Sequence, residues 1–307
     1  MRRQLALAEQ EREHATEVRV KDTLQTNEVV AQRLRIRTSY QTALNAYQAR
    51  KGLARISWAT WFITGGTILL WCITATVMAQ MVGAHDIRSI LMNIASNAID
   101  VHDNDALTTT LIAYGAKDNS LMLQGQYWRF ITPIFLHANA LHIGLNMFNL
   151  VVLGIFLERL YGHLRFLLIY LLTGIISIIA SFYFAPQEIS VGASGAIFGL
   201  VGAYSIFVLV HRRAFPYGGV PALLWLLIIV ALNLSIGFFV SNVDNYAHIG
   251  GLISGCLLGW GFTPLYRLSS HNVLVDKHAL RRRWPLALLT VSGTLVLAII
   301  ALYVMQP

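Results

Sequence analysis

The sequence contains little cysteine and little charge. Only two cysteines occur among its 307 residues, Cys72 and Cys256, and both fall inside apolar runs, where a thiol behaves as a small hydrophobic group. This scarcity argues against a disulfide framework and against a zinc site built from cysteine. Charged residues make up 12% of the chain, hydrophobic residues make up 56%, and the mean hydropathy is +0.57. Such a composition is typical of a protein that crosses a membrane several times.

The first part of the chain, residues 1–55, lacks the marks of a targeting segment. From Met1 to Lys51 there is neither glycine nor proline, and no long apolar run. A cleavable signal peptide needs such a run, and acids such as Glu9 and Glu11 disfavour a mitochondrial transit peptide. We therefore expect a polar, helical, cytoplasmic arm, to which the sequence assigns no chemistry.

Seven apolar runs approach the roughly 20 residues that cross about 30 Å of hydrocarbon. They predict an all-α polytopic membrane protein with spans at about 57–82, 142–160, 164–184, 193–210, 220–240, 246–265 and 285–305. One long loop, about 83–141, separates the first two spans. Within this loop Ile87, Ile90, Leu91 and Ile94 recur at helical spacing, which predicts a helix lying in the membrane interface.

The formal net charge of +8 could indicate a nucleic-acid partner, but the basic residues lie in short segments between apolar runs. This pattern instead predicts orientation, because cytoplasmic segments of membrane proteins are rich in Lys and Arg. With a cytoplasmic N-terminus, the exterior segments hold only Arg88, Lys117 and Arg129 as basic residues. The sequence therefore predicts a cytoplasmic N-terminus, an exterior C-terminus and no nucleic-acid partner.

A few strongly polar residues lie in or beside the spans, where polar groups are costly and usually serve a function. They are His137, His142, Asn146, Ser194 and His248. In the predicted topology all of them lie at the exterior ends of their helices. We therefore expect them to converge on one site.

Ser194 lies in Gly192-Ala193-Ser194-Gly195, at the N-terminal end of an apolar helix. Flanking glycines let a substrate approach the backbone closely, and the free N–H groups of a helix N-terminus can stabilise an oxyanion. Gly195 and Gly199 can equally be a helix-packing pair. This stretch alone leaves both interpretations open.

His248 begins a glycine stripe at Gly251, Gly255 and Gly259, four residues apart on one helix face. If this stripe packs on Gly195 and Gly199, His248 comes within reach of Ser194 as its base. A lone histidine could instead bond to a neighbouring helix. No acidic residue inside the span lies one or four residues from His248, which favours a dyad over a triad.

His142 and Asn146 lie four residues apart and hence on one helix face. Both carry side-chain N–H donors of the kind that stabilises a tetrahedral oxyanion.

Together these residues resemble the rhomboid family of intramembrane proteases, over the six spans from about 57 to 265. The four matching motifs stand in the family's order. They are Trp128-Arg129 in the first exterior loop, the spaced His137, His142 and Asn146, the Gly-x-Ser-Gly at Gly192 to Gly195, and the Ala-His-x-x-Gly at Ala247 to Gly251.

The resemblance implies roles for these residues. Ser194 would be the nucleophile and His248 the general base and acid, with an oxyanion hole made by the Ser194 backbone N–H, His142 and Asn146. Supporting positions would be Gly192, Gly195, Gly251 and His137, with Trp128 and Arg129 ordering the first loop. Phe198 stands where the family often has a Tyr that stacks on the catalytic histidine. It can stack but offers no hydroxyl.

The resemblance also implies domains, with an arm at 1–55, a six-span core at 56–266, and a basic linker with a seventh helix at 267–307. The expected function is a serine endopeptidase that cuts transmembrane proteins near the outer face of a membrane, without metal or cofactor. A bacterial inner membrane is the expected location.

Two alternatives stay open at this point. One is a non-catalytic rhomboid-like protein that binds membrane helices, although such proteins typically lack the serine or histidine that this chain keeps. The other is a transporter or metalloenzyme with His137, His142 and His248 as ligands. Against it, the spans hold no clear carboxylate partner and no His-Glu-x-x-His motif.

Overall fold

The computed structural model describes residues 14, 16–32, 34–35, 38, 56–97, 104–212, 215–239, 243–268, 274–278, 280 and 283–305. Residues 16–32 are helical. The rest of the predicted arm and most of the predicted basic linker lie outside the described residues.

The long helices of the described chain match the predicted spans. They are α2 (Trp58–Met81), α6 (Ala140–Tyr161), α7 (His163–Phe184), α8 (Ser194–Val210), α9 (Val220–Phe239), α10 (Asn245–Phe262) and α11 (Trp284–Val304). Four of the described helices, α2, α6, α7 and α11, are long and apolar enough to cross a membrane. The predicted fold class, an all-α polytopic membrane protein, is confirmed.

The largest boundary error lies at the C-terminal end of α10. We predicted a span to residue 265, but the helix ends at Phe262, and Thr263 has φ −53° and ψ 122°. Pro264 follows Thr263, and a proline disfavours the helical conformation of the residue before it. The proline therefore ends this helix earlier than its hydropathy suggests.

The first loop folds into short helices at one end of the molecule. They are α3 (Ile87–Ser96), α4 (Asn104–Ala113), α5 (Asn119–Leu123), η1 (Tyr127–Phe130) and η2 (Thr132–Phe135). The predicted helix at Ile87 is present as α3, and the Asp86 side chain caps it by accepting from the Ser89 backbone N–H at 3.1 Å. Ile90 and Ile94 are half-buried, whereas Ile87 and Leu91 are exposed, so α3 is amphipathic.

A short hairpin lies between α10 and α11, where we predicted only a linker. Strands β1 (Tyr266–Leu268) and β2 (Leu274–Asp276) pair in antiparallel fashion, with Leu268 opposite Leu274. A further short turn, η4 (Pro216–Gly219), precedes α9. Three-residue strands carry too little periodicity to be recognised in the sequence.

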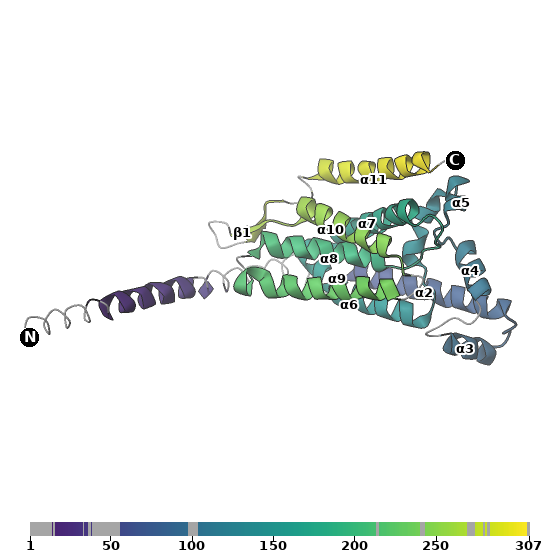
Figure 1. Cartoon of the computed structure of the whole chain (residues 1–307), viewed down its shortest axis with the longest axis horizontal. Coiled ribbons are helices and arrows are strands. Elements are labelled where there is room, and N and C mark those ends of the chain that lie inside the picture. Colours follow the sequence, from purple (N-terminus) through teal and green to yellow (C-terminus); the bar gives the residue numbers. More distant parts are fainter. Residues whose placement is uncertain are drawn as a thin grey trace, which may run out of the picture.

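The long helices α2 and α6 to α10 run along the same direction as a bundle (Figure 1). The hairpin lies at one end of the bundle, and α3, α4 and α5 gather at the other (Figure 1). Helix α11 lies along the outside of the bundle and contacts α7 (Figure 1). A core of buried apolar side chains, including Leu157, Tyr170 and Leu200, joins α6, α7 and α8.

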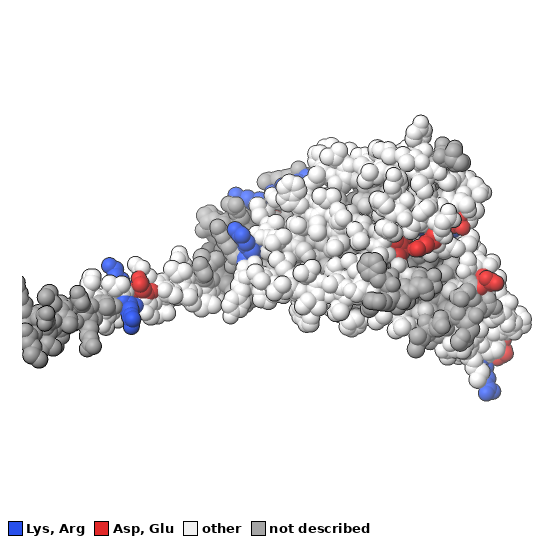
Figure 2. Space-filling view, in the orientation of Figure 1, with Lys and Arg blue, Asp and Glu red and all other residues white. Residues whose placement is uncertain are grey.

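Charge separates along the long axis of the molecule. On the visible face of the bundle, Lys and Arg lie mainly at the hairpin end, Asp and Glu lie at the end of the first loop, and uncharged surface extends between them, while the N-terminal helix carries both signs (Figure 2). An uncharged band between two polar ends suits a bilayer. The predicted orientation, with the basic end in the cytoplasm, stays a prediction.

A buried carboxylate holds the hairpin end together. Glu158 of α6 is fully buried and accepts hydrogen bonds from the backbone N–H of Ala59 at 3.0 Å and of Thr60 at 2.8 Å. It also contacts the His163 ring. These N–H groups belong to the first turn of α2, where donors have no partner within the helix and the helix dipole favours negative charge.

Candidate active site

Helices α8 and α10 meet backbone to backbone along their glycines. A Cβ placed on Gly251 would lie 2.0 Å from the carbonyl oxygen of Gly195, and one on Gly255 would lie 2.0 Å from that of Gly199. Real Cβ atoms do not come so close, so only glycine fits at either position. The predicted pairing of the two glycine stripes is found in the structure.

The other side of α8 packs equally tightly on α7. A Cβ on Gly195 would lie 2.2 Å from the hydroxyl oxygen of Ser177, and one on Gly199 would lie 2.1 Å from that of Thr173. Helix α8 is therefore held between α7 and α10 with little freedom to shift, which is what a site shared between helices requires.

This packing brings Ser194 and His248 together, although they lie 54 residues apart. Oγ of Ser194 and Nε2 of His248 are 2.8 Å apart, within hydrogen-bonding distance. His248 is buried, and its Nδ1 has no hydrogen-bond partner among the described residues. When Nδ1 carries the ring proton, Nε2 is free to accept the serine proton.

Ser194 is the first residue of α8 and follows a tight turn. Gly192 has φ +127°, a conformation that favours glycine, and a Cβ there would lie 2.8 Å from Nε2 of His142. The Gly192 N–H donates to the Pro133 carbonyl at 2.8 Å, and the Ala193 N–H donates to Nε2 of His137 at 3.4 Å. The turn thus lies directly against the His142 ring.

Aromatic and acidic neighbours surround His248. The ring of Phe198 lies parallel to it, with 4.4 Å between ring centroids and 5° between planes. Asp244, one turn before His248, accepts from the Ala247 N–H at 2.9 Å and so caps α10. This cap orients the helix turn that carries the imidazole.

The two predicted oxyanion donors also lie at this end of α6. His142 is half-buried, and its backbone N–H is capped by the Asn139 side chain at 2.8 Å. Asn146 is buried and donates one amide hydrogen to the His142 carbonyl at 3.0 Å. His137 precedes α6 instead of lying on it, and its ring is 5.0 Å from that of His142. Five predicted residues from three segments are thus brought to one region.

Trp128 and Arg129 are neighbours in the sequence but differ in burial. Arg129 is buried, and its Nη1 donates to the carbonyls of Ile112 at 2.9 Å and Ala116 at 2.7 Å, at the C-terminal end of α4. Trp128 is 55% exposed. Arg129 therefore fixes the fold of the first loop, whereas the Trp128 ring is free to contact lipid.

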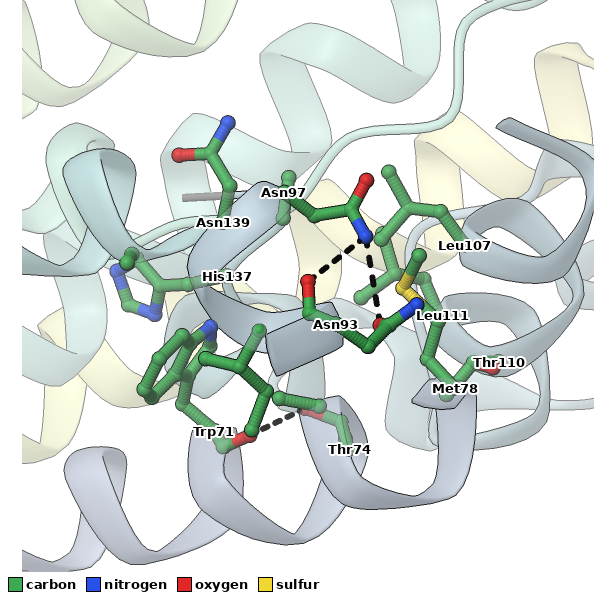
Figure 3. Close-up of a pocket in the computed structure, with 14 residues that line it drawn as sticks. Trp71, Thr74, Met78, Asn93, Asn97, Leu107, Thr110, Leu111, His137 and Asn139 are labelled. Carbon is green, nitrogen blue, oxygen red and sulfur yellow. Dashed lines mark hydrogen bonds between the residues drawn. The ribbon is translucent and has the colours of Figure 1, made fainter. Parts of the chain in front are cut away.

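A small hollow lies beside this region, between α2, α3, α4 and the segment before α6 (Figure 3). Trp71 lines it from α2, Asn93 lines it from α3, and His137 and Asn139 lie along its near side (Figure 3). Neither member of the Ser194 and His248 pair is part of its lining.

No group of three His, Cys, Asp or Glu side chains within the described part of the chain is arranged to hold a metal ion. The expectation that the protein needs neither metal nor cofactor stays a prediction.

Two residues near the site were not among the predicted site residues. Asp244 lies four residues before His248 and just outside the predicted span, at the N-cap of α10. Lys117 was counted as an exterior basic residue, yet its side chain is fully buried. The capping position of Asp244 could have been found from its spacing to Ala247, but nothing local in the sequence indicates that Lys117 is buried.

The fold and these residues define a class of protein. It is an integral membrane protein made of helices, with a serine and a histidine hydrogen-bonded between two glycine-packed helices at one end of the bundle. Residues 124–265, which hold both of these residues and the two predicted donors, match the model of the Rhomboid domain. This part of the chain is therefore a rhomboid domain.

Relatives that share this domain come from bacteria and plants. The chain is 47% identical over 158 residues to Rhomboid protease GluP of Bacillus subtilis (strain 168), covering 51% of this chain and 30% of that protein. It is 44% identical over 154 residues to RHOMBOID-like protein 6, mitochondrial, of Arabidopsis thaliana, covering 50% of each chain. It is 36% identical over 176 residues to Rhomboid protease AarA of Providencia stuartii, covering 50% of this chain and 62% of that protein. The chain thus spans less than two thirds of each of these relatives.

Proposed function

We propose that this protein is an intramembrane serine endopeptidase that uses Ser194 and His248 as a catalytic dyad. The observation that carries this proposal is the 2.8 Å contact between Ser194 Oγ and His248 Nε2 at the first turn of α8. A nucleophile and base within hydrogen-bonding distance, at a helix N-terminus, is the arrangement that covalent hydrolysis requires. The similarity to proteins named as rhomboid proteases, GluP and AarA, supports the same function.

The reaction takes two steps. Ser194 Oγ attacks the carbonyl carbon of the scissile peptide bond while its proton passes to His248 Nε2. The imidazolium returns this proton to the nitrogen of the leaving amine, and an acyl ester remains on Ser194. Water then attacks the ester, His248 accepts a proton from it, and the acid product leaves as Oγ regains a proton.

Negative charge develops on the substrate carbonyl oxygen in both steps. The Ser194 backbone N–H, the His142 ring and the second amide hydrogen of Asn146 are the proposed donors to this oxyanion. A Cβ built on Gly192 would contact the His142 ring and lie 3.8 Å from Ser194 Oγ. The His142 ring and the serine hydroxyl therefore face the same small space, which supports this assignment. Donors fixed before the reaction stabilise the oxyanion without reorganisation.

The substrates would be transmembrane proteins whose helix unwinds locally, because a helix hides its own carbonyls in backbone hydrogen bonds. Small residues near the scissile bond would be preferred. With the predicted orientation, the dyad lies at the exterior end of the bundle, where water can reach it. A bacterial inner membrane, with the N-terminus in the cytoplasm, is the proposed location.

Labelling with a fluorophosphonate probe tests this proposal. The detergent-solubilised protein should be labelled and should cleave a transmembrane substrate, and Ser194→Ala should lose both properties. A Ser194→Ala protein that still cleaves would end the serine-protease proposal. A folded protein that is neither labelled nor able to cleave a membrane substrate would favour the non-catalytic alternative, and cleavage lost on chelation and restored by zinc would favour the metalloenzyme.

A further inference from the structure

The strongest unused feature of the molecule is the buried cation in its first loop. The Lys117 side chain is 0% exposed, and its Nζ donates to the carbonyl of Ala185 at 2.5 Å and to that of Glu188 at 2.8 Å. A buried ammonium is unfavourable unless its hydrogens are bonded. The loop from 185 to 193, called here the serine loop, supplies these acceptors.

The backbone at Lys117 is tied to the same loop. Lys117 N–H donates to the Ser190 carbonyl at 3.1 Å, and Ser190 N–H donates back to the Lys117 carbonyl at 3.4 Å. Asn119 adds a contact nearby, from its side-chain amide to the Phe182 carbonyl at 2.8 Å, in the last turn of α7. The first loop and the serine loop are therefore joined over several residues.

The serine loop leads directly to the nucleophile. It runs from the end of α7 at Phe184 to Ala193, and Ser194 begins α8. Hydrogen bonds to Lys117 tie this loop to the first loop between Ala185 and Ser190, and Val191 packs against the cluster of Leu111, Ala116 and Leu136. A movement of this loop would move the Gly192 turn and the backbone N–H of Ser194 with it.

Arg129 holds Lys117 in place from the other side. Its Nη1 donates to the Ala116 carbonyl, the residue directly before Lys117. Contacts thus run from Arg129 to the Lys117 segment, from Lys117 to the serine loop, and along this loop to Ser194.

We propose that Lys117 is a positioning residue that holds the serine loop, so that the Gly192 turn and the Ser194 N–H stay aligned for reaction. This role rests on the proposed function of Ser194. Lys117 is hydrogen-bonded neither to the dyad nor to the proposed oxyanion donors, and its hydrogen bonds lead to the serine loop.

The charges around Lys117 come from three segments. Asp118 lies on its own loop, Glu188 on the serine loop, and Asp244 at the cap of α10, and each favours the charged ammonium. Burial acts in the opposite direction and is the larger influence, lowering the pKa of Lys117 to about 8 from the usual 10.5. The ammonium is thus the main form at pH 7.

Three variants test the proposal. Lys117→Met keeps the apolar stem of the side chain and removes the N–H donors. Lys117→Arg restores a charged donor at the same position. Lys277→Met is the control, because it replaces an exposed lysine beside the hairpin with methionine. For each, kcat and KM are measured on one transmembrane substrate, together with hydrogen exchange of the peptide spanning 185–193. Wild type and Ser194→Ala serve as references.

Lys117→Met should lower kcat by about 10- to 100-fold with KM nearly unchanged, because misplacement of a reacting group by about 1 Å costs on the order of 10²-fold. Exchange in the serine loop should rise in the same variant. Lys117→Arg should recover a substantial part of kcat, and Lys277→Met should match wild type.

Wild-type kcat in folded Lys117→Met, or an arginine variant no better than the methionine one, would overturn the proposal. Hydrogen exchange at 185–193 that is the same in Lys117→Met as in wild type would also overturn the proposal. This second measurement decides the question even if poor folding of Lys117→Met obscures its kinetics. If wild type shows no cleavage that depends on Ser194, the proposed function fails instead. The exchange result then decides separately whether Lys117 holds the loop.

Discussion

Helix α10 and helix α11 are both apolar helices of similar length, yet they meet the rest of the bundle in different ways. Helix α10 touches α8 through backbone atoms, because Gly251 and Gly255 bring the two chains into direct contact. Helix α11 touches α7 and α10 through side chains such as Leu286, and a Cβ built on Gly293 would meet nothing within 4 Å.

The difference follows the position of the polar residues. His248 must stay within hydrogen-bonding distance of a serine on another helix, and a backbone contact fixes this distance better than flexible side chains do. Helix α11 carries none of the proposed site residues. The helix that holds one member of the proposed dyad is packed through backbone contacts, whereas the peripheral helix α11 is packed through side chains.

The largest effect that separates the two helix surfaces is loss of a dyad side chain. Ser194→Ala should abolish turnover of a transmembrane substrate, and His248→Ala should nearly do so, because a serine hydroxyl without a base is a poor nucleophile. Ser292→Ala on α11, which removes an exposed serine bonded only to the Leu289 carbonyl, should match wild type. Residual turnover in Ser194→Ala at the wild-type rate would contradict the assignment.

The oxyanion donors should matter less than the dyad. Asn146→Ala should lower turnover by about 10²–10³-fold, equal to about 2.7–4 kcal/mol, because one of several donors is lost. His142→Ala should behave similarly. The matched control is Asn149→Ala on the same helix, which bonds a carbonyl four residues back as Asn146 does but is exposed. If Asn146→Ala and Asn149→Ala have equal turnover, Asn146 is not an oxyanion donor.

A branched side chain on the glycine contact tests the packing itself. Gly255→Val should push α10 away from the Gly199 carbonyl and move His248 off Ser194, at a cost of about 10²-fold in turnover. Gly293→Val makes the same change within α11, where the space is open, and should leave turnover within about twofold. Thermal unfolding of both variants checks that each is folded. Equal turnover in the two would show that the α8 and α10 contact does not control the dyad.

The smallest expected effect is on pH dependence. Above pH 8 the Lys117 ammonium loses its proton, so its bonds to the serine loop weaken and turnover should fall by about fivefold, as a loss of roughly 1 kcal/mol implies. Lys117→Arg stays charged and should remove this fall.

Stability should change in the opposite direction. The pKa of Lys117 is about 8 in the folded protein and 10.5 ordinarily, so the unfolded chain binds more protons between these values. This group therefore makes the folded protein more stable as the pH rises from 8 to 10.5. A turnover that falls while the unfolding temperature holds or rises separates positioning from simple loss of structure. A parallel fall in the arginine variant would assign the pH effect to another group.

Much of the molecule could be predicted because its signals are local. An apolar run of about 20 residues predicts a helix wherever it occurs, and the Ile87 to Ile94 spacing predicted α3. The residues of the site could also be chosen, because polar groups such as His248 and Asn146 stand out inside apolar runs. The glycine stripes even indicated which two helices meet.

Other features depend on contacts between distant residues, and only the tertiary structure decided them. The sequence by itself determined the apolar helices, the charged ends and the set of candidate residues, because these depend on composition and spacing along one segment. The 2.8 Å distance between Ser194 and His248 and the burial of Lys117 against the serine loop arise from packing. Lys117 shows the reason: its neighbours Asp118 and Asn119 suggest a solvated loop, and only the carbonyls of Ala185 and Glu188, about seventy residues away, make a buried ammonium possible there.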